Sequence, residues 1–100
     1  MNQPVDRNSP EFQLFCKLSR IIYSHDPMGI GYEEDEYDPE ARTILPRLKD
    51  CQSLDDCERI TKEEFVTWFT EDSVKDIDFR PISIQIWETW INYQKDNTAF

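Results

Sequence analysis

The sequence has few of the residues that build metal and redox sites. Its 100 residues include one histidine, two glycines and three cysteines. Cys51 and Cys57 are six positions apart, whereas a zinc knuckle spaces its cysteines by three, and His25 is remote from both, so we expect no metal site. An odd number of cysteines cannot close a complete disulfide framework. We expect Cys16, Cys51 and Cys57 to be reduced thiols that pack as small apolar side chains.

Long apolar segments are also missing. No run approaches the roughly 20 apolar residues that a membrane span needs. The first residues, MNQPVDRNSP, lack the apolar stretch of a signal peptide. The sequence therefore predicts a protein that stays in the cytoplasm and does not enter a membrane.

Basic residues are scarce relative to acidic ones. Lys and Arg total 11 against 21 Asp and Glu, which gives a formal net charge of −10. Phosphate backbones and anionic lipids repel such a chain, so direct binding to nucleic acid or to a membrane surface is disfavoured. A basic protein is the complementary partner, and nothing in the sequence implies a cofactor.

The chain nevertheless contains enough apolar material for one core. Hydrophobic residues make up 38% of it and aromatic residues 13%, and a chain of this length buries roughly two-thirds of its surface on folding. We expect one domain over residues 1–100, with residues 1–8 as a loose N-terminal segment. Its apolar residues recur mostly at spacings of three and four, which predicts an all-α fold of four or five short helices.

The first helix has clear signals at both ends. Ser9-Pro10-Glu11 combines an N-cap serine, a proline at the first helical position and an acid near the positive end of the helix dipole. The helix ends near Ser24, since His25-Asp26-Pro27 places a proline where the hydrogen-bond ladder would continue. Residues 25–38 then lack helical periodicity and contain both glycines of the chain, so we expect a loop of specific shape.

Similar signals predict the next helices. Asp38-Pro39-Glu40 predicts a second helix with Asp38 as its N-cap, and Pro46 predicts a kink or an early end to it. Ser53 begins a short third helix. Thr61-Lys62-Glu63-Glu64 fits the capping box of a further helix, in which Thr61 bonds forward and Glu64 reaches back.

The C-terminal part is predicted to be an acidic connection followed by a long helix. Residues 71–79 form the connection, and the last helix opens between Asp78 and Pro81 and runs to about Lys95. The segment ISIQIW alternates and is also compatible with a strand within residues 73–87. Its length together with the continuation TWINYQ favours a helix.

The densest chemical feature is the segment from Tyr32 to Glu40. It places six carboxylates within nine residues, together with two tyrosines. An EF-hand that starts at Asp26 would put Met28, Ile30 and Tyr37 at ligand positions, so this is not a calcium loop. Two interpretations stay open: a solvated acidic helix start, favoured by the helix dipole, and a docking surface for a basic protein, favoured by the tyrosines.

No catalytic constellation stands out. The pairs Asp55-Asp56, Glu63-Glu64 and Glu71-Asp72 lie at predicted helix ends without a matched histidine, so capping and solubility explain them better than acid–base catalysis. The cysteines lack the sequence signature of a Cys-His nucleophile. The tryptophans lack the basic flanks of a nucleic-acid platform, and we expect core packing for Trp68, Trp87 and Trp90.

Residues 26–48 resemble a family of small acidic bacterial proteins. Members carry an Asp-Pro-x-Gly turn and then an acidic segment that ends in Asp-Glu-Tyr-Asp-Pro-Glu. The matching positions in this sequence are Asp26, Pro27, Gly29, Asp35, Glu36, Tyr37, Asp38, Pro39 and Glu40. Related small acidic proteins are often encoded beside polymorphic or contact-dependent toxins and act as their immunity proteins. The resemblance covers about a quarter of the chain, and it implies an immunity role without implying any catalytic residue.

These observations predict a non-enzymatic immunity protein that binds and neutralises a basic, nuclease-type toxin domain. The predicted partner-binding residues are Tyr32, Glu33, Glu34, Asp35, Glu36, Tyr37, Asp38 and Glu40. The alternative is a general helical adaptor or regulatory module for a basic protein or peptide. An enzyme would instead require a cleft that holds a perturbed acid or thiol.

Overall fold

The structure is a computed structural model, and it describes residues 9–97. The prediction for residues 1–8 lies outside this range. The described residues form five α-helices and one 3₁₀-helix and contain no strand, which confirms the all-α prediction. The elements are α1 (Pro10–His25), α2 (Asp38–Ile44), η1 (Leu45–Asp50), α3 (Leu54–Phe69), α4 (Glu71–Val74) and α5 (Arg80–Asn97).

The two ends of α1 follow the predicted signals. The Ser9 hydroxyl accepts a hydrogen bond from the Phe12 amide at 3.1 Å, as an N-cap serine should. The helix ends at His25, and Asp26 follows in the left-handed region with φ 44°. Ser53 caps α3 in the same way, since its hydroxyl accepts from the Asp56 amide at 3.2 Å. Local capping chemistry therefore sets both helix starts.

Two predicted helix starts are wrong in detail. Asp38 lies inside α2 and Tyr37 is the N-cap; the Asp38 carboxylate instead accepts a hydrogen bond from the Ser19 hydroxyl of α1. Thr61 starts no helix, because α3 runs unbroken through it and buries it. One continuous helix places Cys57, Thr61 and Phe65 on the same buried face, which two separate short helices would not do.

Pro46 ends the second helix early, as expected. Helix α2 stops at Ile44, and the chain continues as the 3₁₀-helix η1, which contains Pro46. The predicted acidic connection contains the single-turn helix α4, which buries Val74. The ISIQIW segment lies in α5, so the helical interpretation of that segment is confirmed.

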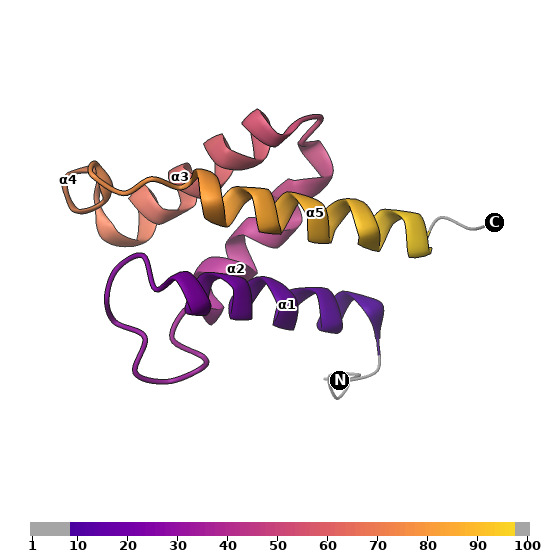
Figure 1. Ribbon diagram of the computed structural model, residues 1–100, viewed down its shortest axis with the longest axis horizontal. Helices are drawn as coiled ribbons and strands as arrows, with labels where there is room; N and C mark the ends of the chain where they lie inside the picture. Colours follow the sequence, from indigo (N-terminus) through magenta and orange to yellow (C-terminus); the bar gives the residue numbers. More distant parts are fainter. Residues whose placement is uncertain (1–8, 98–100) are drawn as a thin grey trace, which may run out of the picture.

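The helices surround one core. In Figure 1, α1 and α5 lie side by side and run in opposite directions, while α2 lies between α1 and α3 and α4 sits at one end. The buried apolar side chains come from all five α-helices, from η1 and from the segments between the helices: Leu14, Leu18, Ile22, Tyr37, Ala41, Ile44, Leu48, Cys57, Ile60, Phe65, Val74, Phe79, Ile82, Ile86 and Trp90. None of the helices in the described residues has the length and apolar character needed to cross a bilayer.

The three tryptophans have different positions, so the prediction of core packing holds only in part. Trp90 is buried and Trp87 is half-buried. Trp68 is 47% exposed, and its indole N–H donates to the Thr43 hydroxyl of α2 at 3.1 Å. Phe69, the next residue, packs against the core, so the exposure of Trp68 follows from its face of α3.

Candidate functional site

The loop between α1 and α2 is held by one carboxylate oxygen. Asp26 Oδ1 accepts hydrogen bonds from the amides of Ile30 at 3.0 Å and Gly31 at 2.9 Å. It also accepts a hydrogen bond from the Tyr37 hydroxyl, with 2.6 Å between the two oxygen atoms. The Tyr37 hydroxyl oxygen in turn accepts from the Met28 amide at 3.0 Å. The two side chains therefore tie both ends of the loop to its middle.

The two glycines serve this loop in different ways. Gly29 has φ +68°, a conformation that side-chain-bearing residues rarely adopt. Gly31 is needed for space, since a Cβ atom there would lie 3.0 Å from Asp26 Oδ1 and 3.3 Å from a ring carbon of Tyr23. The expectation of a specific loop shape is thus confirmed, with a left-handed backbone at one glycine and a close approach at the other.

Tyr37 anchors the loop to the core. Its side chain is fully buried, and its ring centroid lies 6.2 Å from that of Phe65 in α3. Burial raises the pKa of the Tyr37 hydroxyl well above its usual value, and the hydrogen bond to the Asp26 carboxylate raises this pKa further. The hydroxyl is therefore a stable donor to Asp26 across the physiological pH range.

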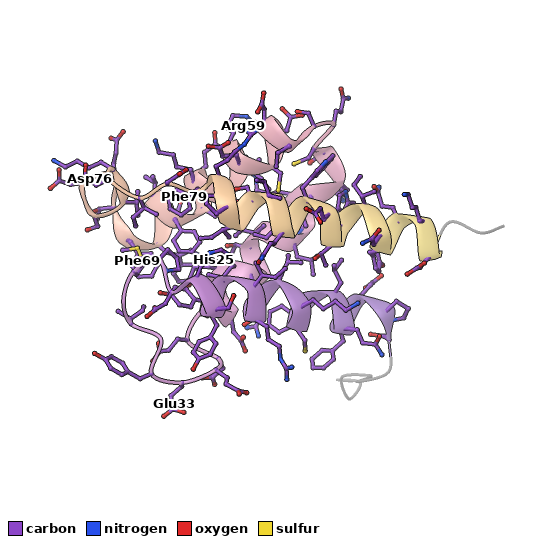
Figure 2. The ribbon with its side chains drawn as sticks, in the orientation of Figure 1. His25, Glu33, Arg59, Phe69, Asp76 and Phe79 are labelled. Carbon is purple, nitrogen blue, oxygen red and sulfur yellow. The ribbon has the colours of Figure 1, made fainter. Side chains whose placement is uncertain are left out.

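The anchored loop displays its acidic residues to solvent. We call Tyr32–Glu36 the acidic loop. Tyr32 is 84% exposed, and Glu33, Glu34 and Asp35 are also exposed, while Glu36 is half-buried. Figure 2 shows Glu33 at the outer edge of this loop, pointing away from the helices. These five residues are the part of the predicted surface that a partner can reach.

The other three predicted residues are less accessible. Tyr37 is in the core, and the half-buried Asp38 is hydrogen-bonded to Ser19. Glu40 is only 3% exposed, and its Oε1 atom has no hydrogen-bond partner among the described residues. Burial raises the Glu40 pKa from 4.5 to about 7, and the nearby charges of Glu36 and Asp38 add to the rise. Glu40 is thus a buried acid behind the acidic loop.

The acids of α3, in contrast, are paired with arginines. Arg47 of η1 contacts Glu63 at 2.7 Å and Glu64 at 2.9 Å. At the other end, Arg80 of α5 binds α3 acids through its Nη1 atom, which lies 2.7 Å from Asp55 and 2.8 Å from Glu58. The described residues give no such arginine or lysine partner to Glu33, Glu34 or Asp35. Within the described part of the chain, Glu33, Glu34 and Asp35 are therefore three consecutive exposed carboxylates without an ion pair, whereas other unpaired acids, such as Glu71, Asp76 and Glu88, lie at separate positions.

The thiols and the histidine occupy separate places. All three cysteines are free. Cys57 is buried between α3 and α5, with its Sγ 3.7 Å from the Ser83 carbonyl oxygen, and burial raises its pKa to about 12. His25 lies at the end of α1 with its Nε2 atom 3.1 Å from Gln85 Oε1. Within residues 9–97 no cluster of three or more His, Cys, Asp and Glu side chains is placed to hold a metal ion.

Sequence reasoning missed the role of Asp26, although a signal for it was present. Asp side chains in turns commonly bond nearby backbone amides, and both glycines of the chain follow Asp26 within five positions. The sequence around Tyr37 and Glu40, in contrast, does not indicate that their side chains are buried. Both positions face α3 or the interior only because α2 packs between α1 and α3.

Comparison with known proteins adds no family to this picture. No protein-family model matches the chain, and no curated protein and no solved structure matches it. The function therefore has to be argued from the acidic loop and the surfaces beside it.

Proposed function

We propose that this protein is a non-enzymatic immunity protein that binds a basic, nuclease-type toxin domain through its acidic loop and thereby neutralises it. The observation that carries the proposal is the set of exposed carboxylates of Glu33, Glu34 and Asp35, which have no basic partner in the described residues. The resemblance of residues 26–48 to a family of small acidic bacterial proteins implies an immunity role and suggests a toxin domain as the partner. The proposal places the protein in the cytoplasm, where such a toxin acts.

The rigidity of the loop supports binding. Gathering several carboxylates costs self-repulsion, and a flexible segment would also lose conformational entropy when it is ordered by a partner. Here the hydrogen bonds to Asp26 Oδ1 and the burial of Tyr37 hold the loop before any partner arrives. The acidic loop can therefore offer its charges to lysine and arginine side chains at a reduced entropic cost.

The charge of the whole chain supports fast capture. A net charge of −10 attracts a basic partner over distances comparable with the Debye length, about 8 Å at physiological salt. Such steering raises association rate constants to about 10⁸ M⁻¹s⁻¹ or more when the two surfaces carry complementary charges. Nuclease toxins present basic residues to phosphates, so carboxylates of this loop are chemically suited to occupy the same residues.

The first experiment identifies the partner and tests the surface together. Immobilised protein captures proteins from the source organism, and mass spectrometry identifies those that bind saturably. Association is then measured for the wild type and for the combined change Glu33→Gln, Glu34→Gln, Asp35→Asn and Glu36→Gln. We expect association about tenfold slower or more at low salt, with nearly unchanged melting temperature.

The matched control removes four acidic charges elsewhere. Glu71→Gln, Asp72→Asn, Asp76→Asn and Glu88→Gln all lie at exposed positions outside the acidic loop. This control variant should retain most of the association rate. Equal slowing in both variants would mean that net charge, and not the acidic loop, governs binding.

Co-expression separates immunity from the adaptor alternative. The captured basic protein is expressed in a test bacterium with and without this chain. Restored growth with the wild type, and weaker protection by the variant with a neutralised acidic loop, would support immunity. Binding without any effect on growth would leave the helical adaptor as the better description.

A further inference from the structure

A groove runs beside the acidic loop, between the outer face of α1 and the start of α2. It is a shallow depression open to solvent, with a volume of about 300 Å³. The residues that matter for its chemistry are Phe12, Phe15, Arg20, Glu34, Asp35 and Arg42. We call this feature the α1 groove. It joins an apolar floor to walls of both charges, which the acidic loop alone does not offer.

Phe12 gives the groove an apolar floor and is not part of the hydrophobic core. Its ring is half-buried and lies 6.2 Å from the ring of Phe15, but Phe12 does not pack against the buried core cluster. Phe15 does pack against this cluster, and the Arg42 guanidinium lies over its ring at 5.5 Å. Phe12 is thus an aromatic side chain on the surface, available to a partner.

Three of the charged side chains around the floor have no ion pair within residues 9–97. Of the other two, Arg42 lies over the Phe15 ring, and Asp38, which also lines the groove, accepts a hydrogen bond from Ser19. Within the described residues, Glu34 and Asp35 have neither an ion pair nor a hydrogen bond from their side chains, and Arg20 likewise has no carboxylate partner. The acids come from the acidic loop, Arg20 from α1 and Arg42 from α2. A cation entering between Glu34 and Asp35 is favoured, whereas a run of several cations would meet the two arginines.

From this arrangement we infer that the α1 groove binds a short extended segment of a partner protein, one that presents an apolar side chain and a single lysine or arginine on the same side. In an extended segment, residues i and i+2 point to the same side. The apolar side chain then covers Phe12, and the cation lies between Glu34 and Asp35. This inference rests on the proposed function and adds to it the kind of segment that the basic partner presents.

The test uses defined peptides, so it does not require the partner. The probe is acetyl-Phe-Gly-Lys-amide, titrated into the full-length ¹⁵N-labelled protein and followed by amide chemical shifts. We expect saturable shifts confined to the α1 groove, including the amides of Phe12 and Asp35. The control peptides acetyl-Phe-Gly-Glu-amide and acetyl-Gly-Gly-Lys-amide should bind at least fivefold more weakly.

Variants on the protein side complete the test. Phe12→Ala, and separately Glu34→Gln with Asp35→Asn, should each weaken binding of the probe at least fivefold. Ile84→Ala is the matched loss of an exposed apolar side chain, and Glu71→Gln with Asp76→Asn is the matched loss of two charges; both should bind the probe normally. Unchanged affinity in Phe12→Ala, equal binding of the glutamate peptide, or shifts spread over the molecule would overturn the inference.

The outcome is separable from that of the proposed function. If the probe fails to bind while the acidic loop still governs association with the basic protein, the α1 groove is not a docking site and the immunity proposal stands. If the probe binds the groove while neutralising the acidic loop has no effect on association with the basic protein, the acidic loop is not the toxin-binding surface. The α1 groove then remains a peptide-binding site.

Discussion

The acids of α3 and those of the acidic loop are chemically alike but differ in their surroundings. On α3, Glu63 and Glu64 share Arg47, and Asp55 and Glu58 share Arg80. These pairs connect α3 to η1 and to α5. The carboxylates of Glu33, Glu34 and Asp35 connect nothing in the described residues. Charge on α3 joins elements of the fold, whereas the loop carboxylates join none of the described elements.

The comparison extends to how each acidic region is held. The acids of α3 keep their positions because they stand on a 16-residue helix with a buried face. The loop has no such helix and depends on Asp26, Gly31 and Tyr37. Removing a side chain of this set should disturb the loop and leave the α3 ion pairs intact.

The largest expected effect comes from Tyr37→Ala. It removes a fully buried aromatic ring and the hydroxyl that binds Asp26, so we expect a loss of about 3–5 kcal/mol in the free energy of unfolding. Urea unfolding measures it. Tyr32→Ala, at the exposed end of the acidic loop, is the control and should change stability by less than about 0.5 kcal/mol. Similar losses in both variants would mean that the core does not hold the loop through Tyr37.

The next effect concerns Glu40 and pH. Its folded-state pKa of about 7 exceeds its ordinary 4.5, so the folded state holds the proton more tightly than the unfolded state. The stabilising contribution of the protonated carboxyl is complete below about pH 4.5 and is lost as pH rises through about 7. Glu40→Gln mimics the protonated form and should gain on the order of 2 kcal/mol relative to the wild type between pH 5 and pH 8.

Unfolding titrations at several pH values measure this difference. Glu36→Gln serves as a partial control, because it removes one neighbouring charge that raises the Glu40 pKa without removing the buried acid. It should retain the pH dependence at reduced size. A Glu40→Gln difference that does not vary with pH would show that Glu40 is already ionised throughout this range.

A smaller effect on stability is expected from Arg47→Met, which removes two ion pairs of the α3 acids. The substitution keeps much of the aliphatic stem and removes the guanidinium that contacts Glu63 and Glu64. Because these groups are partly exposed, we expect a loss of about 0.5–1 kcal/mol that shrinks at high salt. Lys49→Met is the matched control, since Lys49 is an exposed cation of the same 3₁₀-helix. A loss that is independent of salt would assign the effect to packing.

The smallest effect is expected where the sequence is most charged. Glu33→Gln, Glu34→Gln and Asp35→Asn together should change stability by less than about 0.5 kcal/mol, with a slight gain at low salt as repulsion is relieved. Thermal unfolding at two salt concentrations measures this. A clear loss of stability would show that these carboxylates also serve the fold, and the contrast with α3 would fail.

The parts of the structure that the sequence predicted are those that local chemistry determines. Ser9 and Ser53 cap their helices because the cap bonds lie within three residues, and Pro46 ends α2 through its own backbone. The continuity of α3 through Thr61 depended on a core that the local capping pattern did not reveal. For the same reason, the sequence located the acidic loop but did not separate its exposed acids from Glu40.

The antiparallel pairing of α1 and α5 has a practical consequence. It brings the start of α1 and the end of α5 to the same end of the molecule, while the acidic loop lies at the opposite end (Figure 1). The two helix ends nearest to the sites of an affinity tag, a fluorophore or a surface tether therefore lie at the end of the molecule opposite the acidic loop. The kinetic measurements can be made with the protein immobilised by either terminus. A partner held by the acidic loop alone should bind alike in both orientations, whereas one that also covers Phe12, in the first turn of α1, should bind more slowly with the tether beside α1.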